Sequence, residues 1–158
     1  HFISGYTAKV AGTERGVTEP TATFSACFGA PFMPLHPTVY AELLAEKIEK
    51  HGAQVWLINT GWNGQGERMS LRNTRRMVNA AIDGELENAE FVQEPYFGLM
   101  IPTAVPDVPQ EVLDPVSSWD DKNKYDEKAR KLAAMFRANF EEFKDRASEG
   151  ILSGEPLV

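Results

Sequence analysis

The sequence predicts an α/β fold in which one buried strand lies between two helices and a long amphipathic helix follows near the end of the chain. The first observation is a nearly continuous apolar run over 54–59, which is typical of a strand covered on both faces. The second is the helical spacing of apolar residues on either side of it, over 37–51 and 70–81. The third is an amphipathic pattern from about Asp120 to Arg146.

The two flanking helices have recognisable ends. Gly52 stands where a C-terminal cap belongs, and Ser70 is a residue type that caps helix N-termini. The second helix ends near Gly84. The apolar residues that set the two patterns are Val39, Tyr40, Leu43, Leu44 and Ile48 in the first helix and Leu71, Met77, Val78 and Ile82 in the second. We expect both helices to pack against the sheet that contains 54–59.

The N-terminal third is less regular. Residues 1–7 mix aromatic, β-branched and small side chains and predict a strand or strand end. The stretch 8–20 has neither helical nor strand periodicity and predicts a long loop. Residues 22–34, with several phenylalanines, predict buried connecting structure.

The C-terminal half has four stretches. Residues 91–101 are aromatic and β-branched but interrupted by Pro95, which predicts an edge strand or an extended loop. Four prolines make 102–115 irregular, and the amphipathic helix follows. We expect the tail 150–158 to be frayed.

Composition excludes several classes of protein. The chain has 158 residues, 42% of them hydrophobic and 25% charged, which is ordinary for one globular segment. A formal net charge of −7 argues against a non-specific nucleic-acid or membrane-surface binder. A single cysteine, Cys27, and the lack of a signal sequence or long apolar span favour a cytoplasmic location. Because the chain starts at His1, we expect it to be a piece of a longer protein.

A glycine-rich turn over 59–68 follows the predicted strand and precedes a predicted helix, an arrangement that often binds nucleotides. The spacing from Gly61 to Gly66 equals that of a P-loop, but Glu67 stands where the phosphate-binding lysine would be. A carboxylate there would repel phosphate, so the turn should not hold a triphosphate. Two interpretations remain. The turn contacts a base or ribose, or it is purely structural.

Other candidates are weaker. His1, His36 and His51 are too far apart in sequence for a metal site, and Cys27 fits a buried structural thiol better than a nucleophile. The loop 11–20 has glycines on both sides of a polar tip, which suits either an active-site lid or a surface turn.

Several ordered motifs closely resemble ATP-dependent phosphoenolpyruvate carboxykinases. They are HFISGYTAK at 1–9, AGTERGVTEP at 11–20, FSACFG at 24–29, and NTGWNG at 59–64 with Gly66 and Arg68. The resemblance extends through Ile101-Pro102 to the C-terminal helix. It implies the C-terminal part of a P-loop-containing mononucleotide-binding domain, with a mixed sheet, flanking helices and a long C-terminal helix.

The resemblance also implies a reaction. In this family oxaloacetate and ATP give phosphoenolpyruvate, ADP and CO2, with Mg²⁺ and Mn²⁺ assisting, as a step of gluconeogenesis. The family's P-loop, metal ligands and substrate arginines precede the segment that begins at His1, so we expect this chain to be inactive without the N-terminal remainder. No metal ligand is expected within it.

By matching motif, three residues are implied to contact ATP on its adenine side: Arg68, Met69 and Thr74. Relatives commonly have a basic residue before Arg68 and an isoleucine after it, where this chain has Glu67 and Met69. The implied lid consists of Ala11, Gly12, Thr13, Glu14, Arg15 and Gly16. The alternatives are a non-catalytic regulatory or interaction module and a free-standing nucleotide-binding domain.

Overall fold

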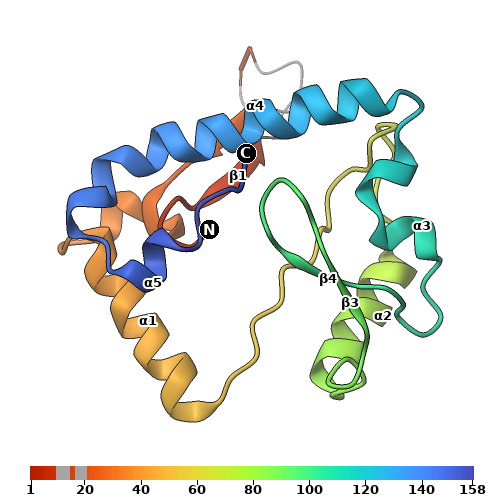
Figure 1. The fold of residues 1–158 in the computed structure, drawn as a ribbon, viewed down its shortest axis with the longest axis horizontal. Helices are drawn as coiled ribbons and strands as arrows, with labels where there is room; N and C mark the ends of the chain where they lie inside the picture. The colour runs from red at the N-terminus through yellow and green to blue at the C-terminus, as the bar shows by residue number, and fades with distance from the viewer. Residues whose placement is uncertain (10–14, 17–20) are drawn as a thin grey trace. The chain divides into compact units, whose positions relative to one another are not determined.

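A computed structural model describes residues 1–9, 15–16 and 21–158. The chain forms two compact units. Unit 1 contains residues 1–54 and 135–155, and unit 2 contains residues 55–134 and 156–158. Both mix helices with a small antiparallel sheet, as an α/β segment should (Figure 1). In the described part of the chain, no helix has the length and apolar character needed to cross a membrane.

Unit 1 is built on an antiparallel strand pair and helical segments. Its elements are β1 (Tyr6–Lys9), β2 (Thr21–Phe24), the 3-10 helices η1 (Ala26–Phe28) and η2 (Ala30–Phe32), α1 (Pro37–His51), the end of α4 (Lys122–Phe140), η4 (Glu141–Arg146) and α5 (Glu149–Leu152). Strand β1 pairs with β2 from Tyr6 opposite Phe24 to Lys9 opposite Thr21. The predicted strand at 1–7 therefore forms, but it begins only at Tyr6.

The core of unit 1 is small and depends on one close backbone approach. Ile3, Phe140 and Phe143 are buried together, and α1 packs near η1 and η4. Gly5 has φ +56°, and a Cβ there would lie 1.7 Å from the Ser25 carbonyl oxygen. Any other residue at this position would therefore push the segments apart.

Helix α1 has the predicted bounds but not the predicted burial. Gly52 adopts the left-handed conformation, and its N–H donates to the carbonyls of Glu49 and Ile48, so the C-terminal cap is confirmed. Most of its apolar side chains remain exposed, Leu43 by 47%. Phe28 and Phe32 are also exposed, by 50% and 86%, so the prediction that 22–34 is buried is wrong for both.

Unit 2 contains α2 (Leu71–Ile82), β3 (Phe91–Gln93), β4 (Met100–Pro102), α3 (Gln110–Leu113), η3 (Pro115–Ser118) and most of α4. Its core gathers Ala80, Leu86 and Val105, with Trp56 and Leu113 packed against them. The Ser70 side chain accepts a hydrogen bond from the Asn73 amide at 3.1 Å, which confirms the predicted N-cap of α2.

The predicted interior strand at 54–59 is wrong. These residues form no helix or strand, as the yellow coil that follows α1 in Figure 1 shows, and Val55 and Leu57 are 67% and 54% exposed. A strand buried on both faces needs neighbouring strands to pair with its backbone. Within the described residues, each of the two sheets has only two strands, and neither includes this segment. The predicted packing of α1 and α2 against such a sheet is therefore also wrong.

The remaining predictions for the C-terminal half are partly met. Within 91–101, β3 and β4 form an antiparallel hairpin, and Pro95 lies in the connecting loop. The Glu94 carboxylate accepts hydrogen bonds from the Tyr96 and Phe97 amides in that loop, the latter at 2.6 Å. In place of one helix to Arg146, α4 ends at Phe140 and η4 continues as a 3-10 helix. Leu71 and Ile82, predicted to face the core, are 62% and 75% exposed.

Candidate functional site

The glycine-rich turn in unit 2 is a short, closed hairpin. The Asn63 amide donates to the Glu67 carbonyl at 2.8 Å, and the Met69 amide donates to the Gly61 carbonyl at 2.9 Å. Between these two bonds Trp62 and Arg68 form an antiparallel bridge. The chain turns back here because Asn63 and the left-handed Gly66, φ +77°, are residue types that favour tight turns.

The backbone amides at the tip of this turn, those of residues 63–67, already donate to acceptors within the protein. The Asn63 side-chain oxygen accepts from the Gln65 amide at 3.0 Å and from the Glu67 amide at 2.8 Å. The Gly66 amide donates to the Asn63 carbonyl, and the Gly64 amide donates to the Ser118 hydroxyl at 3.1 Å. A P-loop cradles phosphate with free amides, so this turn does not have the donors that a triphosphate requires.

Gly64 fixes the turn to the segment before α4. A Cβ at Gly64 would lie 2.3 Å from the Trp119 indole, so only glycine allows the ring to pack there. The Trp119 ring meets Tyr125 edge-on at 5.9 Å between centroids. Burial and nearby carboxylates raise the pKa of Tyr125 to about 12, so its hydroxyl stays protonated at neutral pH. The turn therefore packs against Trp119, and the ring of Trp119 packs against the uncharged side chain of Tyr125.

Arg68 is exposed, and its guanidinium carbon lies 5.8 Å from the centroid of the Trp62 ring. Glu67 forms no ion pair with Arg68, and its carboxylate accepts a hydrogen bond from the Asn63 side-chain amide at 3.1 Å. Among the described residues, Arg68 has no ion pair or side-chain hydrogen bond. It can therefore offer a planar cation to a ligand.

The other two predicted contact residues lie next to Arg68 along the chain. Met69 is half-buried at the end of the hairpin, directly before the Ser70 cap. Thr74 is half-buried in the first turn of α2, where its amide donates to the Ser70 carbonyl at 3.0 Å. The three residues thus lie in the last strand of the hairpin and the first turn of α2.

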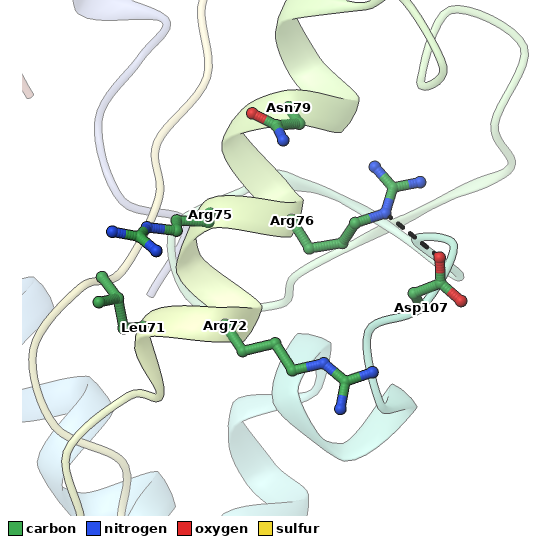
Figure 2. Close-up of a pocket in the computed structure, with 6 residues that line it drawn as sticks. All are labelled: Leu71, Arg72, Arg75, Arg76, Asn79 and Asp107. Atoms are coloured by element: carbon green, nitrogen blue, oxygen red, sulfur yellow. Dashed lines mark ion pairs between the residues drawn. The ribbon is translucent and has the colours of Figure 1, made fainter.

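Helix α2 also carries a basic, open pocket that the sequence analysis did not identify. Figure 2 shows the residues that line it, Leu71, Arg72, Arg75, Arg76, Asn79 and Asp107. The volume of this pocket is about 570 Å³. Arg76 is bound to Glu85 and lies 3.6 Å from Asp107, and its hydrogen bond to Glu85 raises the pKa of Arg76 and lowers that of Glu85. Arg72 and Arg75 form no ion pair with a described residue. The signal available in the sequence was the close spacing of arginines within a chain of net charge −7.

The remaining candidates are placed as follows. The predicted lid residues Ala11, Gly12, Thr13 and Glu14 lie outside the described residues, while Arg15 and Gly16 are described and exposed. Cys27 is buried at 8% exposure, which raises the pKa of its thiol and fits the structural interpretation. Over residues 1–9, 15–16 and 21–158, no three His, Cys, Asp or Glu side chains are grouped in a way that could hold a metal ion.

Comparison with known proteins decides the family. The family model for phosphoenolpyruvate carboxykinase matches residues 1–111. The chain belongs to this family. Phosphoenolpyruvate carboxykinase (ATP) 2 of Moorella thermoacetica is 59% identical over the whole chain, and the enzyme of that type from Flavobacterium johnsoniae is 56% identical over the whole chain. The corresponding protein of Geobacter metallireducens is 58% identical over 96% of the chain.

This chain spans only about a third of those phosphoenolpyruvate carboxykinases, covering 31%, 30% and 29% of their lengths. The ATP contacts of Arg68, Met69 and Thr74 stay predictions, and sequence patterns did not single out Trp62 or Ser118, which the structure places in the same hairpin region. Trp62 could have been suspected because a tryptophan inside a polar, glycine-rich turn has no apolar periodicity to explain it.

Proposed function

We propose that this chain is the C-terminal segment of an ATP-dependent phosphoenolpyruvate carboxykinase and supplies the adenine-side contacts to ATP. The whole enzyme converts oxaloacetate and ATP to phosphoenolpyruvate, ADP and CO2. The observation that carries the proposal is the exposed guanidinium of Arg68 on a hairpin whose tip amides, those of residues 63–67, are all bonded within the protein. Such a site suits the flat face of a purine and does not suit its triphosphate.

Each of the three residues has a defined part in this contact. The guanidinium of Arg68 stacks on the purine, Met69 adds a polarizable apolar surface, and the Thr74 hydroxyl hydrogen-bonds a base edge or the ribose. The phosphates, Mg²⁺ and Mn²⁺ would be held by residues of the longer protein. On this proposal the purified chain alone forms no phosphoenolpyruvate from oxaloacetate and ATP.

Exposed apolar surface in unit 1 favours a segment of a larger enzyme over a free-standing domain. Six large apolar residues between positions 28 and 44 are at least 36% exposed: Phe28, Phe32, Leu35, Val39, Leu43 and Leu44. Monomeric proteins seldom leave so much apolar surface on one segment in contact with water. The remainder of the longer protein is the partner that would cover it.

The decisive experiment replaces Arg68 with alanine in the full-length protein. Loss of stacking and hydrogen bonding should weaken ATP binding about 5- to 30-fold, equivalent to ~1–2 kcal/mol. Affinity for oxaloacetate should be unchanged. Calorimetry measures both, with Arg72→Ala, an exposed arginine in the first turn of α2, as the matched control. Equal ATP affinity of the wild type and Arg68→Ala would contradict the adenine-side assignment.

We also infer, from the family resemblance, that residues 11–20 act as a lid over the complete site. Lys9 and Thr21 are paired at the ends of β1 and β2, so both ends of the loop are fixed. Closure would exclude water and protect the enolate from protonation. In the full-length enzyme, shortening the loop should lower turnover and release pyruvate, with ligand affinities nearly intact. If the shortened-loop variant keeps normal turnover and releases no pyruvate, residues 11–20 are a structural connector and not a lid.

A further inference from the structure

We infer that Trp62 is a positioning residue for the nucleotide base: its indole holds the Arg68 guanidinium so that the purine stacks on the opposite face of that cation. The inference rests on the proposed adenine contact of Arg68 and names a second residue that makes this contact effective. Trp62 is 43% exposed, and so much apolar area at the tip of a polar turn calls for an explanation.

The hairpin places Trp62 and Arg68 directly opposite each other. They form the antiparallel bridge between the two closing hydrogen bonds, and residues opposite each other on such a pair project from the same face. The distance of 5.8 Å from the Arg68 guanidinium carbon to the ring centroid falls within the range of a cation–π contact, about 6 Å. The guanidinium carbon therefore lies over the face of the indole.

The rest of the turn leaves the other face of Arg68 available. Glu67 is the nearest acid in sequence, but its carboxylate is engaged by the Asn63 side chain. A guanidinium is planar, so a base can stack on the face that Trp62 does not cover. Without the indole, the exposed arginine would sample several rotamers and lose more conformational freedom when nucleotide binds.

The hairpin itself is rigid enough to make this positioning useful. Asn63 fixes its tip through its side-chain oxygen, and Gly64 is anchored through Ser118 and packs on the Trp119 ring. A side chain held on such a scaffold keeps its orientation better than one on a free loop. On this fixed hairpin, the indole therefore contacts the guanidinium, and the guanidinium contacts the purine.

The test compares Trp62→Leu and Trp62→Phe in the full-length protein by calorimetry. Leucine keeps apolar bulk but has no ring face, so ATP binding should weaken about 2- to 5-fold, while phenylalanine should recover most of the affinity. Inorganic triphosphate has no base, so its binding affinity should change by less than about 1.5-fold. A purely structural role would weaken both ligands together.

A double-mutant cycle separates this inference from the proposed function. If Trp62 acts through Arg68, adding Trp62→Leu to Arg68→Ala should cause about no further loss of ATP affinity. A normal ATP affinity in Arg68→Ala would overturn the proposed function. Weaker ATP binding in Arg68→Ala, together with an unchanged affinity in Trp62→Leu, would overturn only the role of Trp62. Additive losses would also refute it.

Discussion

Replacement of Gly64 by alanine should destabilise unit 2 and disturb the candidate nucleotide contact at the same time. The new Cβ would lie 2.3 Å from two atoms of the Trp119 indole, whereas carbon atoms in ordinary contact are about 3.5–4 Å apart. The ring would have to retreat by roughly 1 Å or more, against its packing on Tyr125. The change should also strain the hydrogen bond from the Gly64 amide to Ser118.

The magnitude follows from these two effects. Forcing an extra methyl group into a packed site costs about 1–3 kcal/mol, and loss of one hydrogen bond costs about 0.5–1.5 kcal/mol. We therefore expect Gly64→Ala to lower the free energy of unfolding by about 2–4 kcal/mol. ATP affinity of the full-length protein should fall as well, because the hairpin that carries Arg68 would move.

Urea unfolding of the 158-residue chain, followed by tryptophan emission, measures this change selectively. Trp56, Trp62 and Trp119 all lie in unit 2, so the emission reports that unit. The matched control is Gly61→Ala in the same turn, where a Cβ would meet only the flexible Asn59 side chain, at 3.3 Å. If the two variants unfold within about 0.5 kcal/mol of each other, the close packing of Trp119 on Gly64 is refuted.

Two further predictions concern the ends of α2. Ser70→Ala should lower the free energy of unfolding by about 1 kcal/mol, because the Asn73 amide loses its cap; unchanged urea unfolding would contradict this. Arg76 lowers the pKa of Glu85 below its usual 4.5, so the contact between the two side chains stabilises the protein above pH 4.5. This stabilisation is lost as the pH falls through the lowered pKa that Glu85 has in the folded state. Acid titration of Glu85→Gln should therefore show a weaker loss of stability below pH 4.5 than the wild type.

Sequence patterns predicted the helices well because their signals are local. The bounds of α1 and the cap of α2 depend on residues within one helical turn: Gly52 in the left-handed conformation, and Ser70 beside Asn73. The β3–β4 hairpin was predicted less well, because Pro95 suggested an interruption. The proline lies in the loop, and the Glu94 carboxylate holds that loop together.

Nonlocal packing explains the predictions that failed. The apolar run 54–59 indicates a preference for burial, but a strand also needs a partner, and no described segment pairs with it. The same reasoning applies to Phe32 and Leu43, whose apolar side chains have too little neighbouring surface to cover them. At the candidate site, motif matching identified Arg68, but its contact with Trp62 depends on a hairpin register that sequence spacing alone does not specify.

The hairpin also shows why charge at position 67 is not what keeps phosphate away. Replacing Glu67 with lysine would restore a P-loop-like cation, yet the amides of Gly64, Gln65 and Glu67 would still donate to Ser118 and Asn63. An exposed lysine without an amide cradle contributes about 0–1 kcal/mol. In the full-length protein, Glu67→Lys should therefore tighten binding of inorganic triphosphate by less than about fivefold, measured by calorimetry. A gain of tenfold or more would mean that the amides can be released to phosphate, and the separation between base contact and phosphate contact would be wrong.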